Sequence, residues 1–272
     1  MRLILSVSMI IAMFFVSCNY QQKNEQMVQK DTVCPPHSDH LVMATLWFQK
    51  SAECRALQRQ TYRMAQMMLE QNLKTSTCKK KKAVVMDVDE TILDNSPFEG
   101  YLIRNGLIYT LELWQKWTAK ADAKLIAGAG EFIKFAKSKN VEVFYVSNRR
   151  VNEVDATLKN LKKYDLPYTD TLHTYFRTDE SSKTARRNLI KKNYEILMLI
   201  GDNLTDFDDL YKTRKADSGF GDVDSTAEMF GSKYILLPNP MYGDWEKTIY
   251  GNTYKISAEQ RDIVRKKSLE SF

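Results

Sequence analysis

The stretch that decides the fold is Ala83–Val84–Val85–Met86–Asp87–Val88–Asp89–Glu90–Thr91. Its four consecutive apolar residues, 83–86, are typical of a short strand buried in a parallel sheet. Ligands of open α/β folds bind at the carboxyl ends of such strands, where Asp87 and Asp89 follow. Burying carboxylates is costly unless a hard cation such as Mg²⁺ compensates them. We therefore predict that both acids begin a metal-assisted active site, although two solvated acids would fit this motif taken alone.

Three further apolar runs, 141–146, 196–200 and 234–237, indicate strands of the same sheet. Helical patterns precede or separate the strands, at 41–73, 131–139, 151–164 and from 180 onward. Alternating strands and helices predict an α/β fold with a doubly wound parallel sheet. Residues 98–130 contain no strand of the core type and hold several aromatic residues. We expect a mainly helical insertion there, and N-terminal helices before the first strand.

Polar residues follow two of these strands and open one helix. Ser147 and Asn148 follow the second strand, and Asp202 and Asp206 follow the third. Lys183 stands near a helix N-terminus, where a cation is unfavourable unless an anion binds beside it. Because the carboxyl ends of parallel strands meet at one rim, we expect all these side chains to converge with Asp87 and Asp89.

The first 39 residues indicate export and anchoring. One positive charge and a short apolar run fill residues 1–17, which we interpret as a signal peptide. The segment ends in Phe15–Val16–Ser17–Cys18, which resembles a bacterial lipobox. We expect lipidation of Cys18, a flexible tether over 18–39 and a folded domain over 40–272. Asn19 favours the outer membrane of the cell envelope, and a plain secretory signal is the alternative.

Charge and cysteine content exclude several classes of protein. The formal net charge is +6, and the basic runs 79–82 and 265–267 are typical of solvated surface. No basic helix with interleaved aromatics occurs, so a nucleic-acid polymer is not an expected partner. Cys34, Cys54 and Cys78 could form a disulfide in an exported protein, but the sequence assigns no pairing. No C-x-x-C motif is present, which argues against a cysteine zinc site.

The motifs together resemble the haloacid dehalogenase superfamily. They read DVDET at 87–91, SNR at 147–149, SSKTAR around Lys183, and GDNLTD at 201–206. Within that superfamily the chain resembles the class C, or non-specific, bacterial acid phosphatases of the outer-membrane lipoprotein family. That closer resemblance rests on WFQKSAECRALQRQTY (47–62), DVDETILDNSP (87–97), FYVSNR (144–149), GDNLTDFDD (201–209) and LPNPMYGDWE (237–246). It spans roughly residues 47–245.

The resemblance implies a role for each motif residue. Asp87 would attack phosphorus, and Asp89 would protonate the leaving alcohol and later deprotonate water. Mg²⁺ would be held by Asp87, the backbone carbonyl of Asp89 and Asp202, with Asp206 orienting water or Lys183. Phosphate would be held by the remaining three residues, Ser147, Asn148 and Lys183. The second acid is absent from dehalogenases, so its presence favours phosphate ester hydrolysis.

The resemblance also implies the substrates: small phosphomonoesters, namely 5′-nucleotides, nicotinamide mononucleotide and aryl phosphates. Tyr109, Trp114 and Tyr242 are candidates to hold a ring, although Trp114 could equally belong to the core. A phosphotransferase or sugar-phosphate mutase is one alternative, because an aspartyl-phosphate can be intercepted. A non-catalytic lipoprotein that binds haem or a phosphate ligand is another. A homodimer is an assembly that the sequence leaves open.

Overall fold

The computed structural model describes residues 38–214 and 217–272. Its parallel strands are β1 (Lys81–Met86), β4 (Val141–Arg150), β5 (Thr174–Arg177), β6 (Tyr194–Gly201) and β7 (Tyr234–Leu236). Two more strands, β2 (Leu93–Asp94) and β3 (Lys124–Leu125), form a separate antiparallel pair. The α-helices are α1 (Val42–Lys50), α2 (Ala52–Thr75), α3 (Ser96–Arg104), α4 (Leu111–Thr118), α5 (Ala129–Ser138), α6 (Val154–Lys162), α7 (Thr184–Asn193), α8 (Phe220–Ser225), α9 (Asp244–Ile249) and α10 (Ala258–Lys267). Short 3₁₀ helices lie at Asp39–Leu41, Val151–Glu153, Leu204–Asp206, Asp209–Lys212 and Ala227–Met229.

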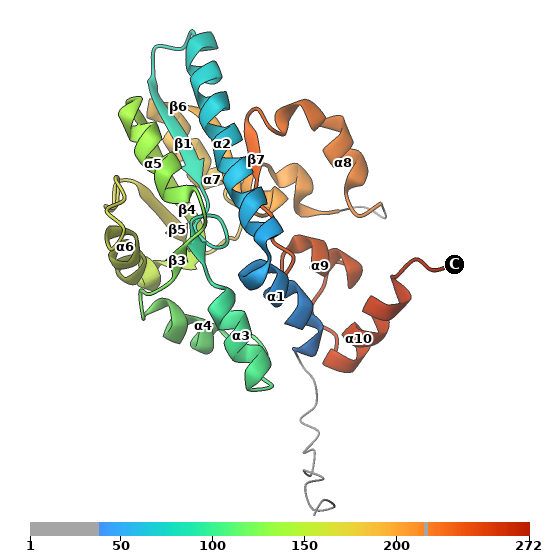
Figure 1. Cartoon of the computed structure of the whole chain (residues 1–272). Coiled ribbons are helices and arrows are strands. Elements are labelled where there is room, and N and C mark those ends of the chain that lie inside the picture. The colour runs from blue at the N-terminus through green and yellow to red at the C-terminus, as the bar shows by residue number, and fades with distance from the viewer. Residues whose placement is uncertain (1–37, 215–216) are drawn as a thin grey trace, which may run out of the picture. The chain divides into compact units, whose positions relative to one another are not determined.

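The main sheet has the strand order β5-β4-β1-β6-β7, and every neighbouring pair is parallel. The first strand of the chain therefore lies at the centre, with β4 on one side and β6 on the other (Figure 1). The chain runs from β1 through β4 to β5 at one edge, then returns to the centre and continues through β6 to β7 at the other edge, which is the doubly wound arrangement. The predicted α/β fold with a doubly wound parallel sheet is confirmed.

Both faces of β1 are buried, which explains its continuous apolar run. Val84 and Met86 belong to the larger core cluster, which includes residues of α2 and α5. Ala83 and Val85 point to the opposite face, in a second cluster with Ile190 of α7. Helices on both faces therefore fix the strand that carries the two aspartates.

The N-terminal helical stretch is divided in two. Ser51 has an extended backbone and its hydroxyl accepts a hydrogen bond from the Cys54 amide at 2.9 Å, which starts α2. Tyr62 of α2 donates a hydrogen bond to the Thr91 carbonyl at 2.6 Å, so this helix supports the loop after β1. Cys54 is a buried free thiol in α2, and Cys78 is an exposed free thiol.

The insertion and the second strand differ in detail from expectation. Residues 98–130 contain most of α3, all of α4 and the start of α5, and also β3, which pairs with β2. The pattern 141–146 predicted a strand that ends before Ser147, but β4 continues to Arg150. Its pairing with β5 shifts register between Ser147 and Arg150. Thus Ser147 lies within the strand just before this irregularity, and Asn148 lies in the irregular segment itself.

The expected signal peptide, Cys18, Cys34 and most of the tether lie outside the described residues. Within residues 38–214 and 217–272, no helix combines the length and the apolar character that a bilayer crossing requires.

Candidate active site

The candidate site lies at the carboxyl ends of the three central strands. Asp87 follows β1 directly, and its amide donates a hydrogen bond to the Ile200 carbonyl of β6 at 2.9 Å. Asp202 follows β6, Ser147 lies near the end of β4, and Lys183 is the residue before α7. The topology brings together residues that are widely separated in the chain, as the sequence predicted.

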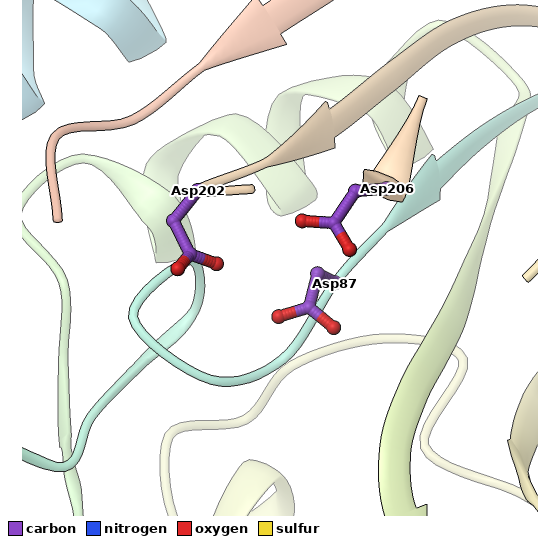
Figure 2. Close-up of side chains that lie close together, drawn as sticks. All are labelled: Asp87, Asp202 and Asp206. Atoms are coloured by element: carbon purple, nitrogen blue, oxygen red, sulfur yellow. The ribbon is translucent and has the colours of Figure 1, made fainter. Parts of the chain in front are cut away.

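Three carboxylates form the acidic part of the site. Oxygens of Asp87, Asp202 and Asp206 lie within 4.8 Å of one another, and Figure 2 shows the three side chains close together. The Lys183 ammonium forms ion pairs with Asp87 and with Asp206, the latter at 2.7 Å. The Asn203 amide donates a hydrogen bond to Asp206 at 3.0 Å. Gly201 is required beside it, because a Cβ atom there would collide with the Asp206 carboxylate.

The electrostatics of this acidic cluster call for a further positive charge. Burial raises the pKa of Asp87 to about 7, against the opposing effect of Lys183, and Asp206 and Asp89 raise it further. Burial, Asp206 and Asp87 likewise raise the pKa of Asp202. Burial would lower the pKa of Lys183, but Asp206 and Asp87 raise it, so the lysine stays charged. One ammonium does not balance three carboxylates, and a ring of oxygen donors fits a hard divalent cation.

The surroundings of Asp89 differ from those of Asp87, because protein groups donate hydrogen bonds to its carboxylate. The Arg149 guanidinium donates to Asp89 Oδ1 through Nε at 2.9 Å and approaches it through Nη2 at 2.8 Å. Asn95 donates to the same oxygen at 2.9 Å, and the Ser147 hydroxyl donates to Oδ2 at 3.3 Å. Arg149 is almost wholly buried. These contacts fix the orientation of the Asp89 carboxylate without a metal.

Several supporting residues had no role in the sequence prediction. Thr91 and Asn239 donate hydrogen bonds to the two oxygens of Asp202, at 3.1 and 2.9 Å. The Asn95 side-chain carbonyl accepts from Trp117 at 2.9 Å and from Arg149 at 3.2 Å. Arg149 adjoins Ser147 and Asn148 in the motif, and Asn95 is part of DNSP, so their positions in the motifs were visible. Their partners were not.

The Asn148 side chain is oriented by an arginine that the sequence also did not single out. Arg186 of α7 donates through Nη2 to Asn148 Oδ1 at 2.7 Å and through Nη1 to the Ser147 carbonyl at 2.6 Å. With its carbonyl held this way, and with no hydrogen bond from its N–H groups to any described residue, the Asn148 amide can turn those N–H groups toward a ligand. Ser147 itself is buried and accepts from the Arg149 amide at 3.1 Å.

The aromatic candidates lie in two places. Trp114 packs edge-to-face on Phe98 with centroids 5.3 Å apart, and Tyr109 does so at 6.1 Å. The Arg149 guanidinium lies 5.6 Å from the Trp114 ring, so this aromatic group adjoins the Asp89 side of the site. Tyr242, in the loop after β7, donates its hydroxyl to Glu90. Burial, with Asp89 and Asp202 nearby, raises the pKa of the Glu90 carboxyl well above its usual value.

Comparison with known proteins agrees with this geometry. The family model described as HAD superfamily, subfamily IIIB (acid phosphatase), matches residues 6–245. The structure of the class C acid phosphatase from Bacillus anthracis superposes with a TM-score of 0.82 and 36% identity, over 87% of this chain and 99% of that one. A tungstate-bound structure of that enzyme matches equally well, at 36% identity and TM-score 0.82, over 86% and 98% of the two chains.

A more distant relative comes from a plant. The stem 31 kDa glycoprotein of Glycine max is 26% identical over 167 residues, and this match spans 58% of each chain. The predicted recognition of a class C acid phosphatase is confirmed by the family model and by the fold together. The chain belongs to the acid phosphatases of the haloacid dehalogenase superfamily, subfamily IIIB.

Proposed function

We propose that this protein is a Mg²⁺-dependent phosphomonoesterase that acts through an aspartyl-phosphate on Asp87. One observation carries the proposal: the two acids of Asp87–Val88–Asp89 occupy opposite environments. Asp87 faces two further carboxylates and Lys183, whereas Asp89 is bound by Arg149, Asn95 and Ser147. Two carboxylates in contrasting environments are suited to unequal roles in acid–base and nucleophilic chemistry.

In the first step, a carboxylate oxygen of Asp87 attacks phosphorus and forms a new P–O bond. The bond from phosphorus to the ester oxygen breaks, and its electron pair goes to that oxygen. Asp89, in its protonated form, delivers a proton there and releases the alcohol. Arg149 and Asn95 hold Asp89 in a fixed orientation for this transfer. Lys183, Ser147 and Asn148 supply donors for the charge on the other phosphoryl oxygens.

In the second step, Asp89 accepts a proton from water as the water oxygen attacks phosphorus. The bond between phosphorus and Asp87 breaks, inorganic phosphate forms, and both aspartates return to their starting states. Asp87, Asp202 and the backbone carbonyl of Asp89 would hold Mg²⁺, and Asp206 lies close enough to orient its surroundings. When bound, the cation offsets the repulsion between anionic substrate and anionic nucleophile.

The oxyanion chemistry of a relative supports this proposal. Tungstate, which is bound in one structure of the B. anthracis class C acid phosphatase, is a tetrahedral oxyanion like phosphate. We extend the proposal to 5′-nucleotides, nicotinamide mononucleotide and aryl phosphates as substrates, with Trp114, Tyr109 and Tyr242 as the residues that contact a ring. Lipid anchoring through Cys18, a location at the outer membrane and a homodimer are proposed on the sequence alone.

The proposal is tested by phosphate release from p-nitrophenyl phosphate, with Mg²⁺ and with excess EDTA. We expect turnover that EDTA abolishes and added Mg²⁺ restores. No metal-dependent release by folded protein would reject the enzymatic function and favour a binding protein. A panel of nucleoside monophosphates, sugar phosphates and aryl phosphates then ranks the substrates by kcat/KM.

A further inference from the structure

Glu90 is a buried acid that the proposed reaction does not use. Its exposed fraction is 0%, although it lies between the loop residues Asp89 and Thr91. Its φ of 51° lies in the left-handed region, which non-glycine residues seldom adopt. The backbone amide donates to the Leu93 carbonyl at 2.9 Å, so the unusual conformation is part of a closed turn. A charged residue type, fully buried in a strained conformation, requires a compensating contact.

The Glu90 carboxyl group makes contacts through both oxygens. Oε1 accepts from the Asn95 backbone amide at 2.7 Å. Oε2 accepts from the hydroxyl of Tyr242, which is 152 residues away in the chain, and the Asn95 side-chain amide approaches it at 3.4 Å. Asn95 in turn donates to Asp89 at 2.9 Å. Glu90 therefore connects the loop that carries Asp89 with the loop that follows β7.

The loop after β7 meets the site at two points. Asn239 binds the carboxylate of Asp202 at 2.9 Å, and Tyr242 binds Glu90. The Tyr242 ring also packs against the larger core cluster. A tyrosine ring with packed carbons and a fixed hydroxyl has little rotational freedom, so one face can be presented in a defined orientation. Such preorganisation lowers the entropic cost of binding a flat ligand.

We propose that Glu90 is a positioning residue that fixes the Tyr242 ring and thereby sets selectivity for phosphate esters whose alcohol carries a ring. The inference rests on the proposed phosphomonoesterase function. It goes beyond that function, because the described hydrogen bonds of the Glu90 carboxyl group go to Asn95 and Tyr242 and not to the phosphate-binding residues or the acidic cluster. Its effect falls on the part of the substrate that leaves, and it acts through the hydroxyl of Tyr242.

The test compares a nucleoside 5′-monophosphate with glycerol 3-phosphate, whose leaving groups are both primary alcohols. Selectivity is the ratio of the two kcat/KM values, measured for wild type, Tyr242→Phe, Glu90→Ala and the double variant. We expect each single variant to lower selectivity by about three- to tenfold. The double variant should lose no more than the more affected single variant, because both remove one contact. Glu90→Gln, which can still pair with the tyrosine hydroxyl, should retain most of the selectivity.

A matched control is Tyr194→Phe, which removes another tyrosine–glutamate hydrogen bond, that to Glu142 at 2.7 Å, at the far end of β6. It should leave selectivity unchanged. Losses that multiply in the double variant, or an equal loss for both substrates in Glu90→Ala, would overturn the inference. If Glu90→Ala does not fold, wild-type selectivity in Tyr242→Phe overturns it instead. Failure of the proposed function is distinct, since wild type would then turn over neither substrate.

Discussion

The two aspartates of the central motif lie two residues apart, yet the molecule treats them in opposite ways. Asp87 faces Asp202 and Asp206, and burial raises its pKa to about 7 although Lys183 is in contact. Asp89 receives hydrogen bonds from Arg149, Asn95 and Ser147, and the buried Arg149 guanidinium lies against it. Around Asp87, the negative charge of three carboxylates exceeds the positive charge that the protein supplies. Beside Asp89, the protein supplies a positive charge of its own, the Arg149 guanidinium.

This difference indicates how one short motif can serve two chemical tasks. The nucleophile Asp87 becomes active only when a cation is bound beside it. Asp89, which transfers protons, must keep the same orientation in both steps of the reaction. Disturbing the Asp87 side should therefore affect metal binding and covalent chemistry. Disturbing the Asp89 side should affect proton transfer and leave the metal in place.

The largest effect is expected for Asp87→Asn, which removes the nucleophile and keeps the shape of the side chain. We expect kcat to fall by about 10⁴-fold or more, because the covalent step has no substitute group. Phosphate release is the measurement, with circular dichroism to show that the fold persists. The control is Asp208→Asn, an exposed acid beyond the cluster, which should keep wild-type turnover. Turnover of Asp87→Asn above about 1% of wild type would exclude the covalent route.

Asp89→Asn should separate the two steps. For an alkyl phosphate we expect kcat to fall by about 10²- to 10³-fold, because the leaving alkoxide lacks a proton donor. p-Nitrophenolate leaves without a proton, so the first step with that ester should survive while hydrolysis of the aspartyl-phosphate slows. Rapid-quench measurement should then show a burst of nitrophenol equal to the enzyme concentration. A steady slow release with no burst would contradict the assignment of Asp89 to both proton transfers.

Arg149→Lys weakens the frame around Asp89 without touching the acidic cluster. A lysine cannot reproduce the planar contacts to Asp89, Thr157 and Asn95, and we expect kcat to fall about tenfold. The Mg²⁺ concentration that gives half-maximal activity should stay unchanged, which separates this side of the site from the other. Arg150→Lys, at the neighbouring position, serves as the control. A shifted Mg²⁺ requirement in Arg149→Lys would show that the two sides are not independent.

The sequence was most informative where an apolar run predicts a strand and the parallel order of the strands fixes where that strand ends. The apolar run before Asp87 and the similar run before Asp202 predicted two neighbouring strands, and parallel pairing then required their ends to meet. Lys183, which the sequence placed near a helix N-terminus, lies at this rim and pairs with Asp87 and Asp206, the anionic partners that a cation in this position needs. These predictions depend on the pattern of apolar residues and on the order of the strands along the chain, and both can be read directly from the sequence.

What could not be predicted depends on the paths of loops. Asn95 and Asn239 stand in recognisable motifs, but only the folded turns after β1 and β7 bring them to Asp89 and Asp202. The extension of β4 beyond Ser147 results from a register shift against β5, which no hydrophobic alternation marks. The two-residue strands β2 and β3 are too short to show the alternation of apolar and polar residues by which a strand is recognised in a sequence.

The smallest expected effect concerns stability against pH, and it tests the excess of negative charge around Asp87. Burial raises the pKa of Asp87 from 3.8 to about 7, so between these values Asp87 holds a proton in the folded metal-free protein that it has lost in the unfolded chain. Stability in EDTA should therefore fall as pH rises from 5 to 7. Mg²⁺ binds the ionised carboxylates, so its stabilising effect should grow over the same range. We expect the Tm difference between Mg²⁺ and EDTA to widen by roughly 5 °C.

Two variants make this measurement specific. Glu99 is a buried acid of α3 whose pKa is raised to about 7 by burial and by Glu246, outside the acidic cluster. Glu99→Gln should reduce the fall of Tm with pH that is measured in EDTA. It should leave the Tm difference between Mg²⁺ and EDTA unchanged. Asp202→Asn removes a carboxylate of the cluster and should abolish that difference at both pH values. A difference that stays constant or narrows toward pH 7 in wild type would mean that the acidic cluster is already balanced without a cation, and that the two aspartates do not differ as their surroundings imply.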